Sequence, residues 1–196
     1  WTAYYLKKAD PSLRVTVVEA EIAGFGAAGR NGGFVSSGIA GSGARYARRS
    51  GWDSVHRAER EVFDGIDEIG RVVSLEGIDC GYKKAGALTV ATTEPQLQRV
   101  RARIEAKHRS GFGPEHIRFL TPDDCAEFLR GPAGLLGASY TPHCARVDPA
   151  RLARGLGDEG VETDLGARVV AGVEPVLVER LLERVDLRPG GGRLGL

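Results

Sequence analysis

The sequence predicts an α/β fold that joins part of a parallel sheet to an antiparallel α+β segment. Three observations lead to this prediction. A helix and a strand occupy residues 1–19, a glycine-rich loop follows at 24–43, and strands alternate with helices from 78 to 142. The composition permits such a fold, because 42% of the 196 residues are hydrophobic and 27% are charged. The length suits one large domain or two small ones.

Charge and cysteine usage exclude several classes of protein. The net charge of +1 gives no strong attraction to nucleic acid or to an anionic membrane. The basic cluster Arg45–Arg49 is expected to be a solvated loop. Cys80, Cys125 and Cys144 are far apart and odd in number, so we expect no disulfide framework, no metal site and a cytoplasmic protein. No apolar run approaches the roughly 18 residues of a membrane helix.

The first elements are a helix and a strand. Trp1–Lys8 has the pattern of a helix that ends at Asp10-Pro11. The chain contains no methionine and starts within this helix, so we expect that it starts inside its gene; a trimmed protein is the alternative. Arg14–Glu19 follows with Val15, Val17 and Val18, a β-branched run that predicts a parallel strand covered on both faces.

The next segment is rich in glycine. Eight glycines fall between residues 24 and 43, too many for a stable helix or strand. Phe25, Phe34 and Ile39 lie among them, which favours a packed loop over a flexible linker.

The rest of the chain alternates between helices and strands. These elements are predicted from the spacing of apolar residues, from Thr-Pro and Asp-Pro pairs where helices begin, and from glycines where helices end. The predicted elements are helix 52–75, one or two strands in 80–92, a helix from Thr93 or Glu94 to Gly111, strand 117–120, a helix from Pro122, strand 135–140 and helix 149–156. Beyond Gly157 we expect a strand pair in 161–173, a helix at 176–185 and a disordered tail at 188–196.

Glu19 is the first candidate for a binding site. A helix followed by a buried strand that ends in an acidic residue is the second half of a Rossmann-like βαβ unit, where the carboxylate binds an adenosine ribose. The phosphate-binding G-x-G-x-x-G turn should lie about 20 residues before the acid. This places the missing glycines just before Trp1, so the Rossmann-like domain is incomplete.

The stretch from Val17 to Gly33, VVEAEIAGFGAAGRNGG, resembles the segment after the second strand in the D-amino-acid-oxidase-like flavoproteins. That superfamily includes glycine and sarcosine oxidases, and the γ-glutamylputrescine-oxidase-like branch is the most similar. Trp1–Leu6 and Thr141–Leu152 resemble the same branch. The resemblance covers about residues 1–156 and is most specific in 19–33.

The resemblance implies FAD as the cofactor and ten residues that bind it. Glu19 would bind the ribose, the Gly26–Gly29 turn would lie near the pyrophosphate, and Arg30–Gly33 would run beside the ribityl chain and the flavin. Arg30 would offset phosphate or flavin charge; pairing with a carboxylate in a loop is the alternative. The ten candidates are Glu19, Ala20, Gly26, Ala27, Ala28, Gly29, Arg30, Asn31, Gly32 and Gly33.

The family also implies two domains. Residues 1–76 and 144–196 would form a discontinuous, incomplete FAD-binding domain, and 77–143 part of an inserted α+β substrate domain with an antiparallel sheet. His143 and Tyr140 lie near the crossing between them, where either could face a substrate or be exposed. No catalytic residue is assigned.

The function that the resemblance implies is FAD-dependent oxidation of a small-molecule amine or amino acid, with no nucleic-acid or membrane partner. A catalytically inactive fragment or a non-enzymatic FAD-binding module is the main alternative. An NAD-dependent dehydrogenase is a weaker one, because the glycine-rich run beyond the strand argues against it. The loss of the family pattern after about residue 156 suggests a shifted reading frame there.

Overall fold

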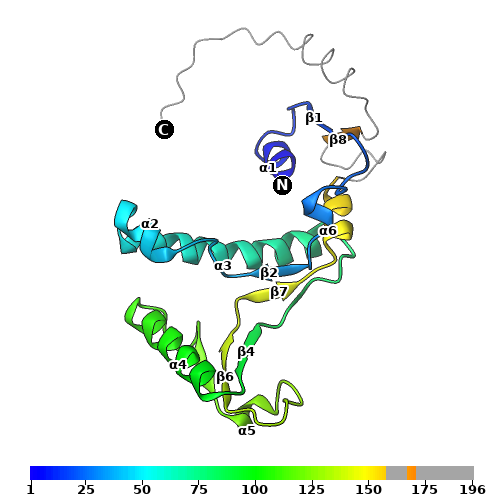
Figure 1. Ribbon diagram of the computed structural model, residues 1–196. Coiled ribbons are helices and arrows are strands. Elements are labelled where there is room, and N and C mark those ends of the chain that lie inside the picture. The colour runs from blue at the N-terminus through cyan, green and yellow to red at the C-terminus, as the bar shows by residue number, and fades with distance from the viewer. Residues whose placement is uncertain (158–166, 171–196) are drawn as a thin grey trace. The chain divides into compact units, whose positions relative to one another are not determined.

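The computed structural model describes residues 1–157 and 167–170. In this part of the chain the α/β prediction holds, with helices and both parallel and antiparallel strand pairs (Figure 1). Of the strand pair expected in 161–173, the described residues contain one strand, Ala167–Val170, whereas the helix at 176–185 and the tail at 188–196 lie outside the described residues.

The chain divides into two compact units. The first unit combines Trp1–Arg30 with Pro149–Leu196, and the second unit is Asn31–Asp148. Compactness alone assigns no role, so the division into a cofactor domain at 1–76 and 144–196 and a substrate domain at 77–143 stays a prediction.

The first unit contains a small parallel sheet. Strand β1 (Val15–Val18) pairs in parallel with β8 (Ala167–Val170), and helix α1 (Thr2–Ala9) contacts both strands. The parallel pairing was predicted, but the expected burial of both faces was not observed: Val17 and Val18 are 39% and 40% exposed. Helix α1 contacts the strand without burying it, so the β-branched residues reflect strand propensity more than burial.

Two further elements complete the described part of the first unit. A 3₁₀ turn, η1 (Ala27–Gly29), lies in the glycine-rich loop and contacts helix α6 (Pro149–Leu156). The helix begins at the predicted proline, whose fixed φ suits the first helical position.

The second unit begins with a short strand and two helices. Strand β2 (Phe34–Ser36) lies inside the glycine-rich segment, where no strand was expected. Helix α2 (Gly43–Ser50) contains Arg45–Arg49, so the predicted solvated loop is wrong. Ser42 caps this helix and so favours it, because the Ser42 side chain accepts a hydrogen bond from the Arg45 N–H at the helix N-terminus. Helix α3 (Trp52–Leu75) has the predicted bounds.

Two antiparallel sheets follow. The first has the order β2-β7-β3, with β7 (Cys144–Arg146) in the middle and β3 (Lys83–Lys84) at one edge. The second has the order β4-β6-β5, with β4 (Ala87–Ala91), β6 (Gly137–Thr141) and β5 (Arg118–Leu120). The predicted antiparallel pairing in this part of the chain is therefore confirmed, while β7 was not predicted.

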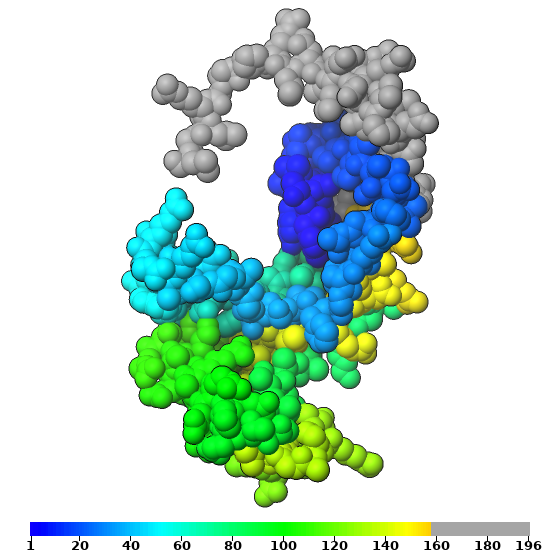
Figure 2. Space-filling view, in the orientation of Figure 1, coloured from blue at the N-terminus to red at the C-terminus, as the bar shows by residue number. Residues whose placement is uncertain are grey.

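The core of the second sheet lies under helix α4 (Glu94–Arg109), which contacts β4, β5 and β6. Val100 and Ile104 of α4 pack on Ala91 and Ile117. The one-turn helix α5 (Pro122–Cys125) covers a second cluster around Ala138. In Figure 2 the green atoms of α4 and the yellow-green atoms that follow it in the chain lie against each other. The three cysteines are free and buried. No helix in the described part is both long and apolar enough to cross a membrane.

Candidate functional site

Glu19 directly follows β1, at the carboxyl end of a parallel strand pair. Its side chain is half-buried, and Oε1 accepts a hydrogen bond from the Glu21 N–H at 3.3 Å. Ligands of α/β folds bind outside the carboxyl ends of the parallel strands. The structure therefore gives Glu19 the position that a ribose-binding carboxylate would need, although its role stays a prediction.

The loop after Glu19 folds back tightly on its own backbone. The Phe25 N–H donates to Ile22 O at 2.9 Å, and the Gly29 N–H donates to Gly26 O at 3.3 Å. A Cβ at Gly29 would lie 2.1 Å from Gly24 O. Gly24 itself has φ +78°, and a Cβ there would lie 3.0 Å from Ala153 Cβ on α6. Close packing requires glycine at position 29, and the left-handed φ together with the nearby α6 requires it at position 24.

The opposite side of the same loop is open. Gly26, Ala27 and Ala28 are exposed, and a Cβ at Gly26 would meet nothing within 4 Å. Short side chains leave the main chain of this turn accessible to a bulky anion, which is what a pyrophosphate needs. The residues present therefore fit the diphosphate part of FAD.

Arg30 and the residues after it have contacts that the sequence did not predict. The guanidinium of Arg30 stacks on the Phe25 ring, with Cζ 3.9 Å from the ring centroid. Asn31 Oδ1 accepts a hydrogen bond from the Gly33 N–H at 2.8 Å, and Gly33 O accepts one from the Val147 N–H at 2.9 Å. Arg30 ends the first segment of the first unit and Asn31 begins the second unit, so the ten candidates are divided between the two units.

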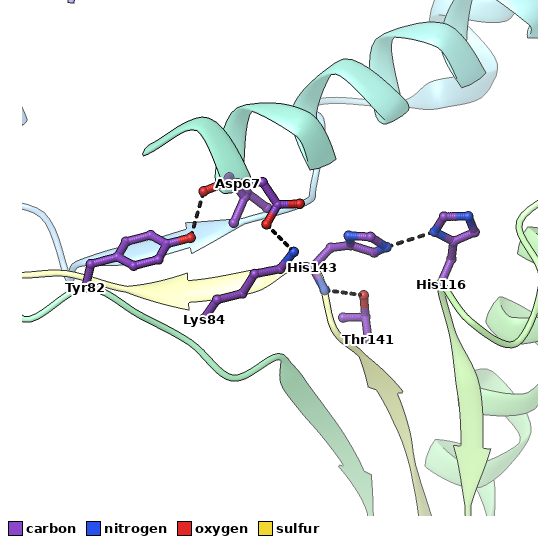
Figure 3. Close-up of polar contacts among 7 residues, drawn as sticks. Asp67, Tyr82, Lys84, His116, Thr141 and His143 are labelled. Atoms are coloured by element: carbon purple, nitrogen blue, oxygen red, sulfur yellow. Dashed lines mark hydrogen bonds and ion pairs between the residues drawn. The ribbon is translucent and has the colours of Figure 1, made fainter. Parts of the chain in front are cut away.

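A second group of polar side chains lies within the second unit (Figure 3). Lys84 on β3 forms an ion pair with Asp67 on α3 at 2.5 Å, and His143 Nε2 lies 2.8 Å from His116 Nδ1. Burial, His116 and Lys84 lower the pKa of His143, with Asp67 and Asp64 acting in the opposite direction. Sequence analysis missed this group, because its members are far apart in the chain and match no motif.

The structure separates the two residues expected near a substrate. His143 stacks on Phe63 and contacts His116, so it is neither isolated nor simply exposed. Tyr140 packs instead with Phe128, and Arg118 lies over its ring. Nothing in these contacts makes either residue catalytic.

Tyr82 joins the strand β3 region to α3. Its hydroxyl donates a hydrogen bond to Ile66 O at 2.7 Å, and its ring occupies space left by Gly70, where a Cβ would lie 2.6 Å from Tyr82 Cε1. Burial, followed by Asp67, raises the pKa of Tyr82. The neutral phenol is thus the form that the fold favours.

We expect Tyr82→Phe to lower the free energy of unfolding by about 1 kcal/mol at pH 7, because the hydrogen bond from the Tyr82 hydroxyl to Ile66 O is lost. Since the folded-state pKa is raised, the stabilisation by Tyr82 is present below about pH 10 and lost above it. Urea denaturation at pH 7 and pH 10.5 measures both effects. Tyr46→Phe is the control, because the Tyr46 hydroxyl donates to Ala40 O in an exposed contact. Equal losses in the two variants would contradict the role of Tyr82.

Comparison with known proteins gives one family. The model of the DAO family, described as FAD dependent oxidoreductase, matches residues 1–191. The match extends well past Leu156, so the expected loss of the family pattern after that residue is wrong. The pairing of β8 with β1 also agrees with a return of the chain to the sheet, and both observations oppose a shifted reading frame.

Individual relatives agree with the family. A probable oxidoreductase, OrdL, of Haemophilus influenzae is 26% identical over 164 residues, which are 84% of this chain and 37% of that protein. Glycine oxidase from Bacillus cereus has a TM-score of 0.61 at 21% identity, over 87% of this chain and 42% of that one. L-amino acid deaminase from Proteus vulgaris has a TM-score of 0.59 at 21% identity, over 87% and 36%. The structural likenesses establish the fold, and the chain spans less than half the length of these relatives.

Proposed function

This chain belongs to the DAO family of FAD dependent oxidoreductases, and on that premise we propose that the protein containing it oxidises an amine or amino acid. The observation that carries the proposal is the position of Glu19 at the carboxyl end of β1, directly before a tightly closed glycine loop with an exposed outer side. The similarity to glycine oxidase and to an L-amino acid deaminase supports this substrate class.

When bound, FAD would supply the redox chemistry, as the acceptor of a hydride from the carbon that bears the amine, and the imine product would hydrolyse. The residues of this chain would bind and orient it. Glu19, beside Ala20, would accept hydrogen bonds from the adenosine ribose hydroxyls. The turn of Gly26, Ala27, Ala28 and Gly29, in which the first three residues are exposed, would let main-chain groups approach the pyrophosphate.

The segment from Arg30 to Gly33 would lie beside the ribityl chain and the flavin. The Asn31–Gly33 hydrogen bond holds this backbone in a turn before β2. Arg30 would have to leave the Phe25 ring to meet a phosphate, or else act from that stacked position. A guanidinium stacked on an aromatic ring is restricted in its motion, which would favour a single binding geometry.

We expect Glu19→Gln to weaken FAD binding at least roughly tenfold, because the ribose hydroxyls lose a charged acceptor worth about 1.5–3 kcal/mol. Titration of the chain with FAD, followed by flavin fluorescence, measures the dissociation constant. Glu21→Gln is the matched control: it removes the same charge two residues later from an exposed side chain, and its affinity should stay within about twofold of the unsubstituted chain.

Two results would count against this site. If Glu19→Gln and Glu21→Gln bind FAD equally well, Glu19 does not hold the ribose. If the unsubstituted chain retains no flavin through gel filtration, these residues do not form a sufficient site, as expected for an inactive fragment. Release of peroxide on addition of a primary or secondary amine would support the oxidase function directly.

A further inference from the structure

Four ring side chains tie together three elements of the second unit. They are Phe63 of α3, Phe112 and His116 of the loop between α4 and β5, and His143 of the turn between β6 and β7. Phe63 stacks on His143 with ring centroids 3.8 Å apart and an interplanar angle of 7°, and Phe112 packs edge-on against His116 at 5.5 Å. We call these four residues the histidine latch.

The two histidines share a single hydrogen bond. His116 Nδ1 and His143 Nε2 are 2.8 Å apart, so one nitrogen donates and the other accepts (Figure 3). Glu115 Oε1 lies 3.4 Å from His116 Nε2, which favours a proton on that nitrogen. His116 Nδ1 is then the acceptor and the His143 Nε2–H is the donor. Both imidazoles are neutral in this arrangement.

An additional proton has no favourable place in the closed latch. On His116 Nδ1 it would set two N–H groups against each other, unless His143 moved its own proton from Nε2 to Nδ1. On His143 Nδ1 it would occupy a buried nitrogen that has no hydrogen-bond partner among the described residues. A buried cation without a partner is costly.

The charged groups around the latch act in both directions. Burial, His116 and Lys84 of β3 lower the pKa of His143, whereas Asp67 and Asp64 of α3 raise it. The ion pair between Lys84 and Asp67 partly offsets the charge of that carboxylate (Figure 3). Around Phe112 the ionisable groups are Arg60, Lys107 and His56, and Lys107 forms an ion pair with Glu59.

We infer that the histidine latch is acid-sensitive: with both imidazoles neutral it holds the α4–β5 loop against α3 and the β6–β7 turn, and uptake of a proton releases this loop. The backbone bonds that would open are from Phe112 N–H to Lys107 O at 3.1 Å and from the His116 and Ile117 N–H groups to Gly113 O at 2.9 and 3.1 Å. Neither histidine of the latch lies on β4, β5 or β6, so the β4-β6-β5 ladder would persist.

The direction of the pH dependence follows from the lowered pKa of His143. A free histidine titrates near pH 6.5, so the stabilisation by a neutral latch is fully present above about pH 6.5. It is lost as the pH falls from there toward the folded-state pKa. Opening linked to one proton becomes more favourable by up to roughly tenfold for each pH unit in this window.

Hydrogen–deuterium exchange of the 196-residue chain at pH 7.5, 6.5 and 5.5 tests the inference, after correction for intrinsic exchange rates. Protection of the Phe112, His116 and Ile117 amides should be constant from pH 7.5 to 6.5 and then fall up to roughly tenfold at pH 5.5. The β4–β6 amides should keep their protection. A loop whose protection does not change, or falls only together with that of the sheet, would overturn the inference.

Substitutions separate the imidazole pair from other effects of acid. In the double variant His116→Gln, His143→Gln, two amide side chains can still form one hydrogen bond but neither takes up a proton. Its loop protection should be the same at all three pH values. His108→Gln is the matched control: His108 Nε2 contacts Ile117 O at 2.9 Å, and this variant should respond to acid as the unsubstituted chain does.

A measurement on the unsubstituted chain keeps the inference testable if the double variant does not fold. NMR titration of the imidazoles should give His143 an apparent pKa below about 6.5, the ordinary value of a histidine. Titration of His143 at that ordinary value would refute the latch.

Discussion

Gly29→Ala is expected to unfold the glycine loop and to abolish most FAD binding. The new Cβ would lie 2.1 Å from Gly24 O and 2.9 Å from Gly24 C, both main-chain atoms. Gly24 cannot easily retreat, because it has φ +78° and lies against Ala153 of α6. Overpacking of this kind costs about 1–3 kcal/mol. The loss of phosphate contacts from a displaced turn would weaken FAD binding by roughly tenfold to a hundredfold.

Gly38→Ala is the matched control for this prediction. It adds the same methyl group at an exposed glycine outside the candidate site, with nothing within 4 Å. Thermal unfolding with and without FAD should therefore show a large loss for Gly29→Ala and a change within about 0.5 kcal/mol for Gly38→Ala. If Gly29→Ala binds FAD as well as Gly38→Ala, the closed loop is not the pyrophosphate site.

The second large effect is expected for Phe112→Ala, which should lower the free energy of unfolding of the second unit by about 3–5 kcal/mol. Phe112 is 1% exposed, and its ring packs edge-on against His56 and at a steep angle against Phe63. Its removal would leave a cavity between α3 and the α4–β5 loop. Trp52 stacks on His56 and is therefore a close fluorescent reporter.

The measurement is urea denaturation in a Trp1→Phe background, in which Trp52 is the only indole. Phe34→Ala is the control, because Phe34 is 80% exposed and its loss should cost less than about 0.5 kcal/mol. A Phe112→Ala variant whose unfolding midpoint matches that of Phe34→Ala would show that the cluster around Phe112 is not a core.

Local patterns predicted the elements whose determinants are local. Helix α3 has the predicted bounds because its apolar residues recur at spacings of three and four over 24 residues. Helix α4 begins after Thr93, where Gln96 Oε1 accepts from the Thr93 N–H. The parallel nature of β1 was also predicted, from its β-branched run.

The failures have physical causes. The Arg45–Arg49 cluster was expected to be a loop, yet the cap at Ser42 and the glycines on either side define a helix that charge alone does not oppose. Strand β7 was missed because three residues carry no periodicity. Its pairing with β2 joins segments more than 100 residues apart, with Phe34 opposite Arg146.

The candidate site, like the fold, could be predicted only where its residues are close together in the sequence. Glu19 and the glycine loop are contiguous, so a family motif could indicate them. His116 and His143 are 27 residues apart in the sequence and come together only through the tertiary structure, so no local pattern could predict the pair. The contact between Arg30 and Phe25 was likewise invisible in the motif, which contains both residues but not their geometry.

The most direct test of the central claim is the crystal structure of the protein containing this chain, with FAD bound. We predict that the ribose hydroxyls of the adenosine will lie within hydrogen-bond distance of the Glu19 carboxylate, about 2.5–3.0 Å. The pyrophosphate should lie against the main chain of Gly26–Gly29. An adenosine bound away from Glu19, or a pyrophosphate with no contact to this turn, would contradict the account.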